Sequence, residues 1–91
     1  MAATACCGDA DMAVFHQCTP HCLQCKIGPS MLASDISDLA NEARSVVAAG
    51  ADELHLDVMD GIFAPNITFG AMMISSLRAH MPGVFLDCHM M

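Results

Sequence analysis

The fold of this chain is decided by one stretch, Glu53-Leu54-His55-Leu56-Asp57-Val58-Met59-Asp60-Gly61. In it, aliphatic residues alternate with His55, Asp57 and Met59, and an Asp-Gly turn follows. Strict alternation is typical of a β-strand, because successive side chains point to opposite faces of the sheet. The stretch therefore predicts a strand over Glu53–Met59 that has one apolar face and one face carrying a histidine and a carboxylate.

The residues before this stretch predict a strand and a helix. A short apolar run over Leu23–Met31 predicts a first strand. A helix is expected to begin after a cap at Ser34 or Asp35 and to end at Gly50, a residue that readily adopts the left-handed conformation. Its apolar residues recur at helical spacing and predict one buried face: Ile36, Leu39, Ala40, Ala43, Val46 and Val47.

The residues after this stretch predict a loop, a helix and a further strand. The loop is expected over Asp60–Gly70, the helix over about Ala71–His80 and the strand over Val84–Met91. Alternation of strands and helices favours a parallel sheet of the α/β class. Parallel sheets are covered on both faces, whereas two helices can cover only one. The sheet is therefore expected to be an incomplete layer with one face left for other contacts.

Three metal-binding side chains fall on the face that the helices leave uncovered. His55 and Asp57 lie two positions apart on one strand, and His89 lies near the end of the next strand. Two imidazoles and a carboxylate at adjacent strand ends suit a divalent metal with open coordination positions. The spacing leaves a structural alternative open, in which His55 is a hydrogen-bonded core histidine and Asp57 a residue of the turn.

The composition excludes several classes of protein. The chain has 91 residues, of which 55% are hydrophobic, and this predicts one small folded unit rather than two domains or a disordered chain. Three Lys and Arg residues against ten Asp and Glu residues give a net charge of −7. Such a charge argues against nucleic acid or an anionic membrane as partner. No window approaches the ~18 consecutive apolar residues of a membrane-spanning helix.

Residues 1–24 differ in composition from the rest of the chain. No Lys or Arg precedes Lys26, whereas secretory and mitochondrial leaders carry basic residues, so the cytoplasm is the expected location. Two histidines and three cysteines fall within ten positions: His16, Cys18, His21, Cys22 and Cys25. They could form a metal knot, but structural zinc sites usually pair two well-separated ligand couples, and a second couple is not present. Residues 1–24 are therefore expected to be a disordered, cysteine-rich extension.

Three ordered motifs resemble the ribulose-phosphate 3-epimerase family. They are Lys26-Ile27-Gly28-Pro29-Ser30-Met31-Leu32 followed by Ser34-Asp35, then Leu54–Gly61 followed by Phe63 and Pro65–Gly70, and finally Asp87-Cys88-His89-Met90-Met91. The resemblance covers essentially residues 25–91. It implies a TIM (β/α)₈ barrel, of which this chain holds the first β-α-β-α-β part, with its active site at the carboxyl ends of the strands.

The resemblance also implies an activity and a cofactor. The family interconverts D-ribulose 5-phosphate and D-xylulose 5-phosphate in the pentose phosphate pathway by removing and returning the proton at C3. By the family pattern, His55, Asp57 and His89 would bind one divalent ion (Zn²⁺, Fe²⁺, Mn²⁺ or Co²⁺), and Asp57 would also be a catalytic acid/base. The residues that the same pattern implies for substrate binding are Ser30, His55, Met59, His89 and Met91.

Related epimerases that act on hexulose 6-phosphates share much of this pattern and are the nearest competing family. In the epimerase pattern, a second catalytic aspartate and the phosphate-binding loops come from later strands, and Asp87 sits too low on its strand to replace that aspartate. The 91-residue chain is therefore expected to be truncated and inactive alone. The alternative is a non-catalytic fragment that binds a metal or a barrel subunit. For the full-length protein, the expected partner is a small-molecule sugar phosphate, and the possibility of a homo-oligomer is left open.

Overall fold

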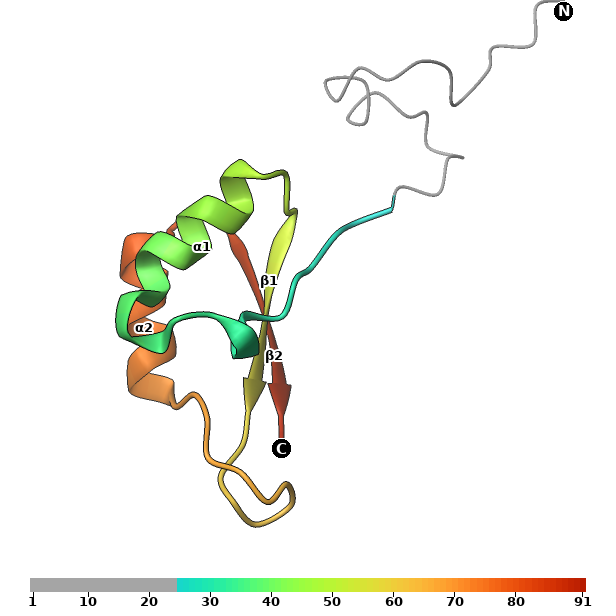
Figure 1. The fold of residues 1–91 in the computed structure, drawn as a ribbon, viewed down its shortest axis with the longest axis vertical. Coiled ribbons are helices and arrows are strands. Elements are labelled where there is room, and N and C mark those ends of the chain that lie inside the picture. The colour runs from blue at the N-terminus through green and yellow to red at the C-terminus, as the bar shows by residue number, and fades with distance from the viewer. Residues whose placement is uncertain (1–24) are drawn as a thin grey trace, which may run out of the picture.

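The computed structural model describes residues 25–91, which form two helices packed on one face of a two-stranded parallel sheet (Figure 1). The helices are α1 (Leu39–Ala48) and α2 (Ala71–His80), and the strands are β1 (Glu53–Val58) and β2 (Phe85–Met90). Two short 3-10 helices precede α1, namely η2 (Met31–Ala33) and η3 (Ile36–Asp38). The α/β class and the parallel pairing predicted from the sequence are confirmed for this part of the chain.

The hydrophobic core lies between the sheet and the two helices. Leu54 and Leu56, which are alternate residues of β1, are fully covered on the helical side. The buried cluster consists of Met31, Leu39, Ala43, Leu54, Leu56, Phe69, Leu77 and Met81. Burial of this apolar surface is the main favourable contribution to folding. It also fixes the orientation of β1, so that His55 and Asp57 lie half exposed on the face away from the helices.

The two strands pair in parallel over their whole length. The register places His55 beside Asp87 and Asp57 beside His89. Residues paired in this way point to the same face of the sheet, so all four polar side chains share the face that the helices leave open. The helix α2 and the loop before it connect the strands, as a parallel pair requires.

The first strand predicted over Leu23–Met31 is wrong as a regular strand. Its described part runs extended beside β1, but it forms a single β-bridge, between Ser30 and His55. Pro29 O accepts a hydrogen bond of 3.0 Å from His55 N. In a regular parallel ladder, the N–H of residue 29 would also donate to β1, and proline has no N–H. The predicted β-α-β-α-β order is therefore observed with its first strand reduced to an extended segment.

The first regular helix begins later than predicted. The Asp35 side chain accepts a hydrogen bond of 2.9 Å from Ser37 N and caps η3, whereas α1 begins only at Leu39. Ile36 was predicted on the buried face, but it lies in the η3 turn and is 50% exposed. The end agrees with the prediction, because Gly50 follows α1 with a φ of 111° in the left-handed region.

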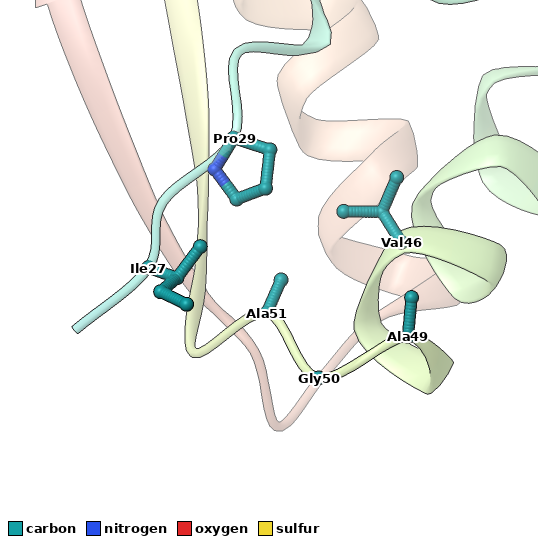
Figure 2. A pocket seen from close by; sticks show the side chains of 6 residues that line it. All are labelled: Ile27, Pro29, Val46, Ala49, Gly50 and Ala51. Carbon is teal, nitrogen blue, oxygen red and sulfur yellow. The ribbon is translucent and has the colours of Figure 1, made fainter.

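An apolar hollow of about 310 Å³ lies beside the start of β1. Its lining residues are Ile27, Pro29, Val46, Ala49, Gly50 and Ala51 (Figure 2). None of them carries a charged or hydroxyl side chain, whereas ligand sites combine apolar walls with a few well-placed polar groups. The hollow therefore does not suit a metal or a sugar phosphate, and the polar face of the sheet is the candidate site.

Neither helix within residues 25–91 has the length and apolar character needed to cross a membrane. The disordered extension predicted for residues 1–24 lies outside the described residues, as do four of the five members of the metal knot weighed against it, all except Cys25.

Candidate metal centre

Three side chains that could hold a metal ion converge on the open face of the sheet, as the strand pattern predicts. His55, Asp57 and His89 each offer one ligand atom, and these atoms lie within 4.8 Å of one another. Asp57 and His89 are partners in the register, and His55 shares their face because it lies two positions before Asp57 on β1. The next-to-last residue of each strand thus belongs to the group, at the carboxyl end of the sheet where open α/β proteins bind ligands.

Asp57 is at the centre of this group. Its Oδ1 lies 3.2 Å from His55 Nε2 and 3.4 Å from His89 Nδ1, and its side chain is 15% exposed. Its Oδ2 accepts a hydrogen bond of 2.9 Å from Ser30 Oγ. That bond lowers the pKa of Asp57, desolvation opposes the effect, and the proximity of His55 lowers the pKa further. Asp57 is therefore an ionised carboxylate at neutral pH, the form that binds a cation or accepts a proton.

His55 lies between two carboxylates. Its Nδ1 is 2.7 Å from Asp87 Oδ2, while its Nε2 faces Asp57 Oδ1. The hydrogen bond with Asp87 raises the pKa of His55, desolvation acts against it, and the charge of Asp57 raises the pKa again. The contact with Asp87 was not predicted from the sequence. The signal that could have found it is the parallel register, which makes these two residues direct neighbours.

Thr68 joins the end of β1 to the loop that follows. Its Oγ1 accepts a hydrogen bond of 3.0 Å from Met59 N and donates to the backbone oxygen of Asp57. Thr68 N in turn donates to Met59 O at 3.2 Å. These bonds fix the backbone at the residue that carries the central carboxylate. No pattern in the sequence singled out Thr68, because a single hydroxyl that bonds backbone atoms about ten residues away has no periodicity.

The remaining predicted site residues lie next to this group in different ways. Ser30 contacts Asp57 directly through its hydroxyl. Met59 and Met91 each follow directly after a strand, and both are half-buried. Met91 N donates a 2.7 Å hydrogen bond to Val58 O, which extends the strand pairing to the end of β2. Contacts of Ser30, Met59 and Met91 with a substrate stay predictions.

The donor set fits a divalent transition metal. Two imidazoles and one carboxylate suit Zn²⁺, Fe²⁺, Mn²⁺ and Co²⁺, and a set of three protein ligands leaves coordination positions open. The three ligand atoms already lie close together on two paired strands. His55, Asp57 and His89 are thus the residues that could hold a cofactor ion.

A family model described as the ribulose-phosphate 3-epimerase family matches residues 26–91. The chain belongs to this family. Among curated relatives, the cytoplasmic isoform of ribulose-phosphate 3-epimerase from Oryza sativa subsp. japonica is 58% identical over 66 residues, a match that covers 72% of this epimerase-family chain and 28% of the rice protein. The ribulose-phosphate 3-epimerases of Rhodobacter capsulatus and Bacillus subtilis are 46% and 44% identical over 66 residues.

The family predicted from the three motifs is therefore confirmed, and the matched range of this epimerase-family member contains every predicted site residue. The relatives are named as epimerases, which are isomerases. The chain spans less than a third of the length of these relatives, with coverage of 28%, 28% and 30%.

Proposed function

We propose that this chain supplies part of the active site of a metal-dependent ribulose-phosphate 3-epimerase, which interconverts D-ribulose 5-phosphate and D-xylulose 5-phosphate in the pentose phosphate pathway. One observation carries the proposal. The ligand atoms of His55, Asp57 and His89 lie within 4.8 Å of one another on a pair of parallel strands. The family match and the names of the relatives support the same activity.

Asp57 is the proposed acid/base. The proton at C3 is acidified by the neighbouring C2 ketone, and an ionised carboxylate with a lowered pKa can accept it. Oδ1 faces the two imidazoles and would hold the ion with them, which leaves Oδ2 to exchange the proton. When bound, a divalent ion supplies Lewis-acid stabilisation of the negative charge that develops next to C3. Ser30 contacts Oδ2, which supports its assignment to the substrate side.

The other proposed substrate contacts surround this carboxylate. His55 and His89 lie beside Asp57, and Met59 and Met91 follow the two strand ends. Methionine sulfur is polarizable and carries no proton, so it can lie against delocalised charge without protonating it. A sugar phosphate is thus the proposed small-molecule partner.

Inversion at C3 also requires a proton from the opposite face. Asp57 is the one carboxylate of the ligand group within residues 25–91, and Asp87 is directed at His55. Because the chain spans less than a third of its relatives, we propose that a different part of a (β/α)₈ barrel provides the second acid/base and the phosphate site. The 91 residues alone are therefore expected not to turn over ribulose 5-phosphate.

A chimera tests the proposal. Residues 26–91 replace the matched segment of the rice epimerase, and turnover of D-ribulose 5-phosphate is measured. The chimera is expected to be active, and Asp57→Asn is expected to lower kcat by about 10²–10⁴-fold, because it removes an acid/base. Asp60→Asn is the matched control, since the Asp60 carboxylate accepts a hydrogen bond from Ile62 N in the loop and lies outside the ligand group.

Two outcomes would contradict the proposal. Full activity of the Asp57→Asn chimera would remove the acid/base role. A folded chimera that binds zinc without turnover would favour the alternative, a non-catalytic metal- or subunit-binding fragment. A cytoplasmic location is proposed as well, supported by the rice relative, which is named a cytoplasmic isoform.

A further inference from the structure

Both ring nitrogens of His55 face carboxylate oxygens. Nδ1 lies 2.7 Å from Asp87 Oδ2, and Nε2 lies 3.2 Å from Asp57 Oδ1. The backbone of His55 is fixed as well, because its N–H donates to Pro29 O at 3.0 Å and β1 is paired on its other side with β2. The position of the ring is therefore determined by its two carboxylate contacts.

The number of protons on the His55 ring determines which of its two nitrogens can donate a hydrogen bond. A neutral imidazole carries one N–H, so only one of its nitrogens donates and the other presents a lone pair. Asp87 makes the shorter of the two contacts, so we assign the N–H to Nδ1, which donates a hydrogen bond to Asp87 Oδ2. The lone pair of Nε2 then faces the Oδ1 of ionised Asp57, and two electron-rich atoms at 3.2 Å repel each other unless a positive charge joins them. A divalent ion would meet this need.

We propose that Asp87 is the positioning residue of the metal centre, which accepts the Nδ1 proton of His55 and thereby directs the Nε2 lone pair toward Asp57 and the ion. This inference rests on the metal site of the proposed function. It adds to that site a carboxylate that binds no metal itself, because Asp87 lies outside the group of ligand atoms and contacts the far nitrogen of the ring.

The strand register produces this arrangement. Asp87 is the partner of His55, and His89, two residues further along β2, is the partner of Asp57. The strand β2 thus provides the proposed ligand His89 and also Asp87, which orients the ligand His55 on β1. Outer carboxylates of this kind fix the tautomer of a metal-binding histidine, and their loss typically weakens metal affinity about 10–100-fold.

The test follows the His55 ring itself in the 91-residue chain. Nitrogen NMR of ¹⁵N-histidine-labelled protein reports which ring nitrogen carries the proton, first at alkaline pH without metal and then during titration with Zn²⁺. The His55 signals report zinc bound at this site, and a zinc buffer sets the free Zn²⁺ concentration independently of any zinc that the cysteines take up. The wild-type chain is expected to carry the proton on Nδ1 and to bind zinc through Nε2.

Asp87→Ala is expected to release the ring, so that the proton distributes over both nitrogens and the zinc affinity measured at His55 falls about 10–100-fold. Asp60→Asn removes a carboxylate just beyond the end of β1 that does not contact His55, and it is expected to change neither quantity. A merely structural role of Asp87 would lower stability without changing the tautomer.

Three results separate the possibilities. Zinc bound through Nδ1 of His55 in the wild-type chain would overturn the proposal. This measurement uses the wild-type chain alone, so it does not depend on whether a variant folds. An unchanged tautomer and zinc affinity in Asp87→Ala would overturn it equally. A wild-type ring that holds its proton on Nδ1 but never responds to Zn²⁺ would instead reject the metal site of the proposed function, and with it the ion toward which Asp87 directs the ring.

Discussion

Ser30 Oγ donates a hydrogen bond of 2.9 Å to Asp57 Oδ2, although the two residues are 27 positions apart in the sequence. The same hydroxyl oxygen accepts a hydrogen bond of 3.2 Å from Leu32 N, so the backbone of η2 holds it in place. The carboxylate is thereby oriented with its second oxygen toward the imidazoles of His55 and His89. Ser30 thus orients the central carboxylate of the candidate centre, in addition to any contact that it makes with a substrate.

Loss of this hydroxyl is expected to weaken metal binding. Ser30→Ala removes the donor to Asp57, and the loss of an outer hydrogen bond to a ligand typically costs at least about tenfold in affinity. A Zn²⁺ titration followed through the His89 ring signals measures the effect. Ser76→Ala, an exposed change on α2, is the control and should leave the affinity unaltered. Equal zinc affinity in both variants would contradict the supporting role of Ser30.

The core under the site is expected to carry much of the stability. Leu56 is 1% exposed, and Leu56→Ala should lower the free energy of unfolding by about 2–5 kcal/mol, because it leaves a cavity beneath β1. Ile62→Ala is the control, since Ile62 is 89% exposed in the loop after β1 and should change stability by less than about 0.5 kcal/mol. Urea denaturation measures both, and similar midpoints would contradict the assignment of the core.

The turn after Asp60 is expected to require glycine. Gly61 has a φ of +85°, and a Cβ there would lie 3.3 Å from Ile67 Cγ1. Gly61→Ala should therefore destabilise the chain by about 1–2 kcal/mol, the usual cost of a left-handed alanine. At Gly83 an added Cβ meets no atom within 4 Å, so Gly83→Ala serves as control in the same denaturation experiment. Stability lost equally at both positions would show that backbone conformation at Gly61 is not the cause.

Stability at acidic pH is expected to depend on Asp35. Hydrogen bonds from the Ser37 hydroxyl and then from its backbone N–H lower the pKa of Asp35 below 3.8 in the folded chain. A lowered folded pKa stabilises the fold above the unfolded value, and this contribution is lost as the pH falls through the folded pKa. Asp35→Asn keeps a capping side chain that does not titrate. Melting temperatures of both proteins should converge between about pH 5 and pH 2, and a constant difference would contradict the prediction.

Local patterns predicted most of the elements that carry the site. The alternation around His55 and Asp57 predicted β1 and its two faces, and the turn residues around α2 predicted its bounds, Ala71–His80. These features are set by residues that are close in the sequence, so a local sequence pattern is enough to predict them. The convergence of His55, Asp57 and His89 followed because parallel strands end at the same edge.

The features that were missed depend on contacts between distant segments. The first strand failed because Pro29 lacks the N–H that a continuous ladder with β1 needs. The contact between Asp87 and His55 depends on the register of β1 and β2, and a one-residue shift would remove it. Phe69 is buried although it lies in a loop, because the segment leading into α2 turns its ring into the core.

The contacts that define the site join residues 27 and 32 positions apart. Closing such separations is slow compared with forming a helix, so the group around Asp57 forms only when the extended segment, β1 and β2 have all docked. His89 is also the last of the three residues in the sequence and follows both helices. A metal ion held by all three side chains would therefore bind this segment only after these elements have docked, and its occupancy would report that docking.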